Sequence, residues 1–295
     1  MKQRHCEDVK LPRVPLLRRR IIPGMGSGSA AAVTGSDATP VLGQGGISMT
    51  HLPTVKAVSA HFSGLNANTL KLLAVLAMIS QHIACLFLPD DTGVYFLMYQ
   101  VGRITAPIMC FFIAEGFYHT SNLRKYMMRL LILALLSHVP HALAFGFSPL
   151  VFWRVTSVMW CHLLGLIALT VVKKTQIHWL WKLLWVGLCC IASYPGNFNC
   201  AVVLWIPTFG IFRDQSVKKW LAFTAVTFLY FAEYWVVDSD GEPWSRLLIL
   251  LTIPLLMLYN HQLGRKSKVL QWGYYFIYPV HFLILYAVKC LLGVL

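Results

Sequence analysis

Two ionisable side chains, Lys71 and His82, lie within one long apolar stretch of the sequence. Their separation of eleven residues is close to a whole number of helical turns, so a helix places both on one face, about 16 Å apart along its axis. Polar groups in hydrocarbon cost on the order of 3 kcal/mol each and commonly mark functional sites. The pattern indicates a charge at the entry of a membrane helix and a titratable base, His82, well inside it.

A second apolar stretch contains Arg103 and Glu115, with Pro107 between them. A separation of twelve residues puts the two charged side chains about 120° apart on an ideal helix, and Pro107 should bend that helix. We therefore expect no direct pair between Arg103 and Glu115. Each needs another partner, which His82 or the last apolar stretch could supply. The alternative is that both charges only join helices to one another.

The last apolar stretch places Tyr274, Tyr278 and His281 on one helix face, at positions i, i+4 and i+7. Pro279 lies beside them and frees a backbone carbonyl from its helical hydrogen bond.

Structural roles are the alternative for these residues. A lone histidine in an apolar helix is usually an interhelical hydrogen-bond partner, and this is the alternative for both His82 and His281. Lys71 could be a lysine at the end of a span whose ammonium reaches the lipid headgroups.

The remaining histidines and the cysteines do not indicate a metal site. His138, His141 and His162 have no Asp or Glu close in sequence, and their spacing matches no common ligand pattern. The eight cysteines include no Cys-x-x-Cys and lie mostly within apolar stretches, which indicates small apolar side chains rather than disulfides. We predict no metal.

The composition is that of an integral membrane protein. Of the 295 residues, 57% are apolar and 12% are charged, and the mean hydropathy is +0.63. Such a chain is too apolar for a soluble fold and long enough for one bundle of several spans. The net charge of +14 does not indicate a nucleic-acid partner, because no groove-reading motif accompanies it and the basic residues lie mainly in the N-terminal tail and in short connections.

Nine apolar segments follow residue 65, each close to the length of a tilted membrane span or slightly shorter. We therefore predict an all-α, polytopic membrane helix bundle of about nine transmembrane helices. The segments are 67–88, 94–119, 126–147, 157–172, 178–194, 199–212, 219–237, 244–260 and 270–293.

Basic residues collect in alternate connections, as expected for cytoplasmic loops. This alternation predicts a cytoplasmic N-terminus, and it puts Lys71 at the cytoplasmic end of its helix with His82 toward the far side. The basic groups precede the first segment and follow the second, fourth, sixth and eighth: Arg18 to Arg20; Arg124, Lys125 and Arg129; Lys173 and Lys174; Arg213, Lys218 and Lys219; Arg265, Lys266 and Lys268.

The chain divides near residue 65. Residues 1–65 are basic and rich in Gly, Ser and Ala, with no apolar periodicity, which predicts a disordered tail. The alternative is that translation starts at Met49 and that the preceding residues are absent from the natural protein. Residues 66–295 form the predicted membrane domain.

Several stretches, in order, resemble the TraX family of conjugative-pilus proteins. The resemblance covers about residues 68 to 290. Its strongest parts are 70–83, 102–107, 115–130, 253–260 and 276–281.

The chain departs from the family pattern at two places. It has Gln81 where the family usually has Asp, and the family's Asn-Val-Phe-Thr-like opening of the fourth span is Ser157-Val158-Met-Trp-Cys-His162 here. The amide of Gln81 can still hold the imidazole of His82 through a hydrogen bond, but it stabilises imidazolium less well than a carboxylate does.

TraX proteins are in turn similar to the type 3 membrane acyltransferases, whose first span carries a basic residue, ten residues and then His, a spacing that Lys71 and His82 match. The resemblance implies a multi-pass protein of the bacterial inner membrane that takes an acetyl group from acetyl-CoA. The implied acceptor is a pilin, N-acetylated during conjugative pilus assembly, or another envelope protein.

The resemblance also implies how acetyl-CoA would bind. Its pantetheine arm would run through the bundle and present the acyl group near His82, and the roughly 16 Å from Lys71 to His82 suits the length of that arm. The basic side chains at the cytoplasmic end would neutralise its phosphates: Lys71, Arg124, Lys125 and Arg129.

The catalytic roles follow from this arrangement. His82, kept neutral by burial, would act as general base on an acceptor amine or hydroxyl. Arg103, or His281 with Tyr278, would stabilise the oxyanion. Glu115 would orient a basic partner.

Two other classes of function compete with an acyltransferase. A transporter or channel could use Arg103, Glu115, His82 and His281 as an ion or proton relay, although the two halves of the sequence show no convincing internal repeat. A non-enzymatic assembly protein could hold pilin subunits without modifying them, and it would need neither an acyl donor nor the chemistry of His82.

Overall fold

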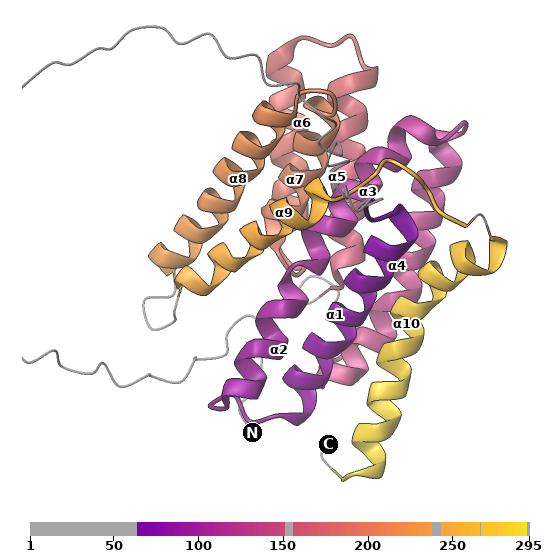
Figure 1. The fold of residues 1–295 in the computed structure, drawn as a ribbon, viewed down its shortest axis with the longest axis vertical. Helices are drawn as coiled ribbons and strands as arrows, with labels where there is room; N and C mark the ends of the chain where they lie inside the picture. Colours follow the sequence, from indigo (N-terminus) through magenta and orange to yellow (C-terminus); the bar gives the residue numbers. More distant parts are fainter. Residues whose placement is uncertain (1–63, 151–155, 238–242, 266, 294–295) are drawn as a thin grey trace, which may run out of the picture. The chain divides into compact units, whose positions relative to one another are not determined.

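The computed structural model describes residues 64–150, 156–237, 243–265 and 267–293, so the predicted disordered tail and Met49 lie almost wholly outside the described residues. The described part of the chain is helical, with two isolated β-bridges and no strand. The elements are α1 (Ala67–Phe87), α2 (Gly93–Arg103), α3 (Thr105–His119), α4 (Leu123–Phe145), α5 (Val158–Lys174), α6 (Trp179–Ala192), α7 (Asn199–Ile211), α8 (Ser216–Val237), the 3-10 helix η1 (Pro243–Leu251), α9 (Thr252–Met257) and α10 (Lys268–Leu291) (Figure 1).

Each of the nine predicted apolar segments is helical, but two of them are interrupted. Segment 94–119 is divided at Ile104 into α2 and α3. Pro107 explains the division, because it has no N–H to donate to the carbonyl of Arg103 four residues earlier, and α2 ends at Arg103. The bend expected from Pro107 is therefore a break. Segment 244–260 is similarly divided into η1 and α9.

Four helical stretches within the described residues are long and apolar enough to cross a membrane: Ala67–Phe87, Gly93–His119, Leu123–Phe145 and Trp272–Leu291. Three further apolar helices are shorter, at Trp179–Ala192, Asn199–Ile211 and Ser245–Met257. The protein is thus an all-α protein with several candidate spans, while the count of nine spans and the cytoplasmic N-terminus remain predictions.

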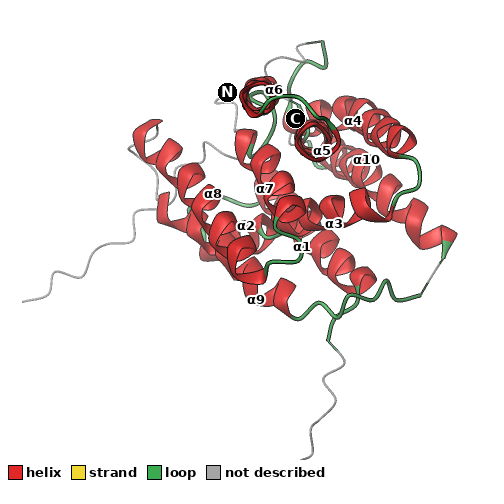
Figure 2. Cartoon of the chain, turned by 90° about the horizontal axis from the view of Figure 1, so that it is seen from above, coloured by secondary structure: helices red, strands yellow, loops and turns green. Residues whose placement is uncertain are grey.

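The short helix α7 is apolar because protein surrounds it. It contacts α3, α5, α6 and α8, and it lies between α8 and the pair α3 and α5 in Figure 2. Val202, Val203, Trp205 and Ile206 are fully buried on its different sides. A helix that is apolar all round can be a core helix or a membrane span, so the hydropathy of segment 199–212 could not distinguish the two.

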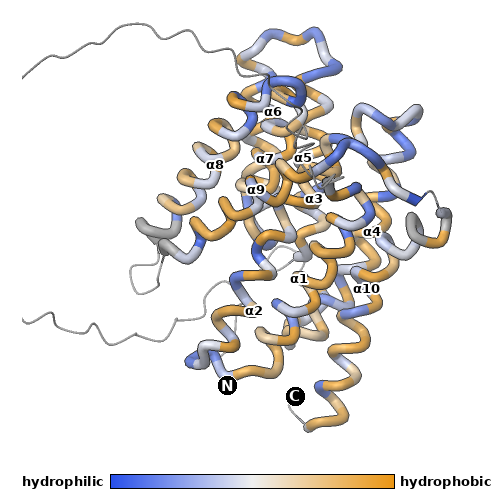
Figure 3. The backbone as a smooth tube through the Cα atoms, viewed as in Figure 1, coloured by the Kyte–Doolittle hydropathy of each residue, from blue (hydrophilic) through white to orange (hydrophobic). Residues whose placement is uncertain are grey.

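Large apolar side chains cover the outer faces of both the long helices and the shorter helix α6. Leu76 of α1, Leu135 of α4, Trp181 of α6 and Ile284 of α10 are each more than half exposed, and Figure 3 shows the helices predominantly in the hydrophobic colour. Exposed apolar surface on this scale is expected where side chains face lipid.

The polar connections gather at one end of the helices. The connections after α3, α5, α7 and α9 lie at the upper end of the helices in Figure 1, which is also the end at which α1 starts, and the connections after α3 and α9 are hydrophilic in Figure 3. Two hydrogen bonds join helices at this end. Tyr118 Oη of α3 donates to the carbonyl of Gly210 in α7 (2.5 Å), and Lys182 Nζ of α6 donates to the carbonyl of Val172 in α5 (3.0 Å). We call it the basic end, since the described basic residues of these four connections lie there.

The start of α1 is fastened to the α9–α10 connection. Asn66 caps α1 by accepting a hydrogen bond from the N–H of Thr69 (3.0 Å), and the Ala67 N–H donates to the carbonyl of Gln262 (2.8 Å). Asn68 Nδ2 donates to the carbonyl of Arg265 (2.8 Å). These contacts hold the first and last helices of the described chain next to each other at the basic end.

Candidate active site

A buried pair of histidines joins α1 to α10. Nε2 of His281 lies 2.9 Å from Nδ1 of His82, and the two residues are 5% and 8% exposed. Phe145 and Phe282 contact the ring of His82, and Phe282 also contacts His281. The sequence placed both histidines in apolar helices, and the fold brings them into direct contact.

The hydrogen bonds of His281 assign the protons of the pair. Its Nδ1 lies 3.0 Å from the carbonyl oxygen of Ile277, which can only accept, so Nδ1 carries the proton. In a neutral ring Nε2 then has the lone pair and accepts from Nδ1–H of His82. His82 is left with an unprotonated Nε2, which is the form that a general base requires.

Gln81 does not orient His82. In the described chain its amide makes no hydrogen bond to the imidazole, and its side chain faces α2, where a Cβ added at Gly102 would lie 2.2 Å from the Gln81 Cβ. Adjacent residues on a helix point about 100° apart. The expectation that the Gln81 amide holds the ring is therefore wrong for this structure, since His281 takes that place.

A cavity of about 760 Å³ extends from the basic end to His82. Lys71, Val75, Met78 and His82 line it along α1, so they share a face as their spacing predicts. Its volume falls in the range of about 300–1,000 Å³ that is usual for small-molecule sites. The walls come from α1, α2, α3, α4, α5 and α10, and from the α3–α4, α6–α7 and α9–α10 connections.

The predicted donor-binding residues are only partly brought together. Lys71 and Arg129 line the cavity. The Lys71 ammonium lies 4.9 Å from the centroid of the Phe112 ring, and Nε of Arg129 has no hydrogen-bond partner among the described residues. Arg124 and Lys125 are exposed in the first turn of α4, at the same end but outside the cavity wall.

The predicted face of the last helix lies against the same cavity. Tyr274 and Tyr278 line it, and Tyr274 Oη donates to the carbonyl of Asn68 (2.9 Å). The ring of Tyr278 is 5.5 Å from that of His281, centroid to centroid. Tyr278 and the histidine pair therefore form one cluster.

Arg103 lies away from this cluster. It is 3% exposed, its guanidinium lies 5.3 Å from the centroid of the Tyr99 ring, and Nη1 is 3.5 Å from Oγ of Ser245. Arg103 is not among the described residues that line the cavity. It joins α2 to η1, which is the structural alternative for this charge.

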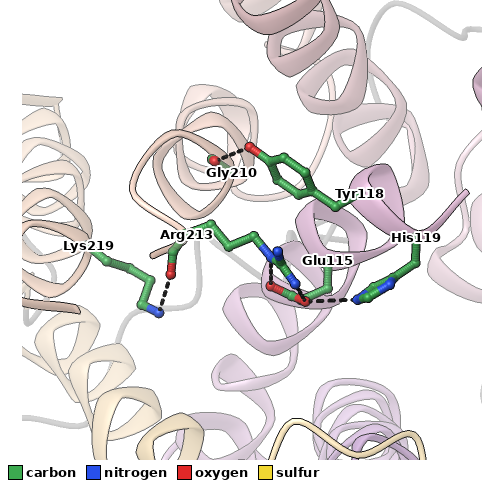
Figure 4. A network of polar contacts seen from close by, with 6 residues as sticks. All are labelled: Glu115, Tyr118, His119, Gly210, Arg213 and Lys219. Atoms are coloured by element: carbon green, nitrogen blue, oxygen red, sulfur yellow. Dashed lines mark hydrogen bonds and ion pairs between the residues drawn. The ribbon is translucent and has the colours of Figure 1, made fainter. Parts of the chain in front are cut away.

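Glu115 finds its partner in the α7–α8 connection. Its two carboxylate oxygens accept hydrogen bonds from Nε and Nη2 of Arg213 at 2.9 and 3.0 Å, and His119 Nε2 lies 3.4 Å from Oε2 (Figure 4). Lys219 donates to the carbonyl of Arg213 (3.2 Å). The hydrogen bonds that Arg213 donates to Glu115 raise the pKa of Arg213 above its usual value. The sequence suggested His82 or the last helix as the partner of Glu115. The structure shows Arg213 instead.

The Glu115–Arg213 pair is expected to stabilise the fold. A double-mutant cycle of Glu115→Gln and Arg213→Gln should give a coupling free energy of about 1–3 kcal/mol, because each single change leaves the other charge without its bidentate partner. The measurement is the free energy of unfolding in detergent. His119→Gln is the control, since its side chain is 71% exposed and should matter little. Strictly additive effects of the two changes would contradict the prediction.

The structure adds residues that the sequence did not single out as ligands. His162 of α5 is 1% exposed and lines the cavity, and so do His119, Arg265 and Asn68 at the basic end. From the sequence, His162 is a candidate only for a metal site, and Arg265 indicates only which connections are cytoplasmic. Among the described residues, no three His, Cys, Asp or Glu side chains are placed to hold a metal ion.

Comparisons with known proteins add a family and a relative. A family model described as "TraX protein" matches residues 66–289. The chain is 27% identical to the "Probable fimbrial assembly protein FimC, serogroup H1" of Dichelobacter nodosus over 241 residues, which are 77% of this chain and 97% of that relative. No solved structure matches the chain significantly.

Proposed function

Because this chain belongs to the TraX family, we propose that it is a membrane acyltransferase that moves an acetyl group from acetyl-CoA to a pilin subunit during pilus assembly. The printed name of the relative, a fimbrial assembly protein, supports the role in pilus assembly. The observation that carries the enzymatic part is the single cavity that joins the basic end to the His82–His281 pair.

The cavity fits an acyl-CoA thioester. Lys71, Arg129 and Arg265 line its basic end, where they would hold phosphates through charge-assisted hydrogen bonds. The Arg129 Nε has no partner among the described residues, which leaves a buried donor for a ligand to satisfy. Acetyl-CoA, when bound, supplies an activated acyl group.

The residues at the deep end would perform general base catalysis. His82 holds its proton on Nδ1 against His281, and its Nε2 would take a proton from the acceptor amine. In this tautomer the one N–H of neutral His281 is bound to the Ile277 carbonyl, so His281 would position His82 rather than bind an oxyanion. Of the groups expected to stabilise the oxyanion, Tyr278 lines the cavity, whereas Arg103 and His281 are not among the described residues that line it.

Intact mass of the cognate pilin tests the proposal. Pilin from cells that carry the gene should be heavier by one acetyl group than pilin from cells without it, and tandem mass spectrometry should place that group on the N-terminal amine. Purified chain in liposomes should transfer ¹⁴C from labelled acetyl-CoA to a pilin peptide. Pilin of equal mass with and without the gene, together with a defect in pilus assembly, would instead support a non-enzymatic assembly protein.

A further inference from the structure

His162 is a buried histidine whose ring nitrogens make no hydrogen bond of normal geometry to a described residue. The residue is 1% exposed and lines the cavity. The ring makes a hydrogen-bond contact with the backbone of Ala106, but neither ring nitrogen reaches the distance and angle of a normal hydrogen bond to a described residue. A buried polar group left without a partner costs about 1–3 kcal/mol, so a ligand that bonded to His162 would recover that cost.

The N-terminus of α5 opens next to His162. α5 begins at Val158, one turn before His162, and both residues line the cavity. Ser157 is the N-cap, but its side chain makes no capping hydrogen bond. The hydroxyl oxygens of Thr156 and Ser157 are also buried without a partner of normal geometry among the described residues. A helix N-terminus carries partial positive charge from its unpaired N–H groups and favours electron-rich oxygen.

Tyr278 connects this polar corner to the general base. Its hydroxyl lies beside Ser157 and the backbone of Val158, and its ring contacts His281. His281 in turn is bonded to His82. Val158 at the α5 N-terminus, His162, Tyr278 and His82 thus line one cavity.

We propose that His162, Tyr278 and the α5 N-terminus form the site that binds the carbonyl oxygen of the acyl group. This inference rests on the proposed acyltransferase function. His82 Nε2 takes the proton of the attacking amine while the C–N bond forms. The C=O electron pair moves onto oxygen, where the N–H of His162 and the helix N-terminus stabilise the charge. The electron pair then returns, the C–S bond breaks, and the thiolate of the donor leaves.

Infrared difference spectroscopy of bound [1-¹³C]acetyl-CoA tests the inference. The labelled carbonyl should absorb at a higher frequency in His162→Leu than in the wild-type chain, because one hydrogen bond to the oxygen is lost. His162→Gln keeps an N–H donor and should stay close to the wild type. His162→Leu should lower kcat about 100-fold with little change in acetyl-CoA affinity. His138→Leu is the matched control, since His138 is buried but bonds to the Pro149 carbonyl outside the cavity.

The outcomes separate this inference from the proposed function. An unchanged carbonyl frequency in His162→Leu that still binds acetyl-CoA overturns the inference and leaves the acyltransferase standing. A wild-type chain that does not bind acetyl-CoA overturns both. If His162→Leu does not fold, the ring ¹⁵N resonances of His162 in the wild type, assigned with His162→Gln, should shift on addition of acetyl-CoA. Resonances that do not shift would refute the inference.

Discussion

Replacement of His82 by Gln is expected to lower kcat for acetyl transfer by about 10³- to 10⁴-fold. The amide can still donate a hydrogen bond to His281, but it has no nitrogen that accepts a proton, so the proposed general base is lost. The KM for acetyl-CoA should change little, because Lys71 and Arg129 lie at the other end of the cavity. Initial rates with a pilin peptide at saturating acetyl-CoA measure the effect.

His138→Gln is the control for His82→Gln. His138 is also buried, and the substitution is of the same kind. Its Nε2, however, lies 2.9 Å from the Pro149 carbonyl, and His138 is not among the described residues that line the cavity. Its replacement should leave the rate within a few-fold of the wild type. A His82→Gln chain that folds and transfers acetyl groups at the wild-type rate would remove His82 from the mechanism.

Replacement of His281 by Leu is expected to lower kcat by about 10²- to 10³-fold. Without an acceptor for its Nδ1–H, His82 can rotate or place its proton on Nε2, and either change removes the lone pair that takes the acceptor's proton. Loss of the group that fixes a catalytic histidine's tautomer costs about 10⁴-fold where that group is a carboxylate, and a neutral imidazole should matter less.

Rescue distinguishes positioning by His281 from simple packing. His281→Gln keeps an oxygen or nitrogen near the position of Nε2 and can accept from His82, so it should recover most of the rate that His281→Leu loses. Both variants should bind acetyl-CoA normally. Equal loss in the two variants would mean that His281 acts through packing against Phe282 and not through its bond to His82.

The sequence allowed much of the fold and half of the site to be predicted, for physical reasons. Helical periodicity is local, so the nine apolar segments, the shared face of Lys71 and His82, and a departure from a straight helix at Pro107 follow from the chain alone. The pairing of Glu115 with Arg213 does not, because the two residues are 98 apart and the sequence does not say which connections meet.

Burial and hydrogen bonding were also beyond the sequence. The apolar pattern of α7 is the same whether lipid or protein surrounds it. From the sequence there is equal reason to place Arg103 and His281 in the site. In the structure the Arg103 side chain lies against Ser245 instead. The sequence around His162 indicates neither a metal ligand nor a catalytic group, and its burial in the cavity wall without a normal partner among the described residues is visible only in the structure.

The His82–His281 bond has a consequence for biogenesis. Its two halves come from the first and last helices of the described chain, 199 residues apart. A nascent chain enters the membrane from its N-terminus, so His82 arrives early and spends most of synthesis without the partner that fixes its proton. The proposed acyl-transfer site can be completed only when α10 is in place, and we expect a truncated chain that lacks α10 to be inserted but inactive.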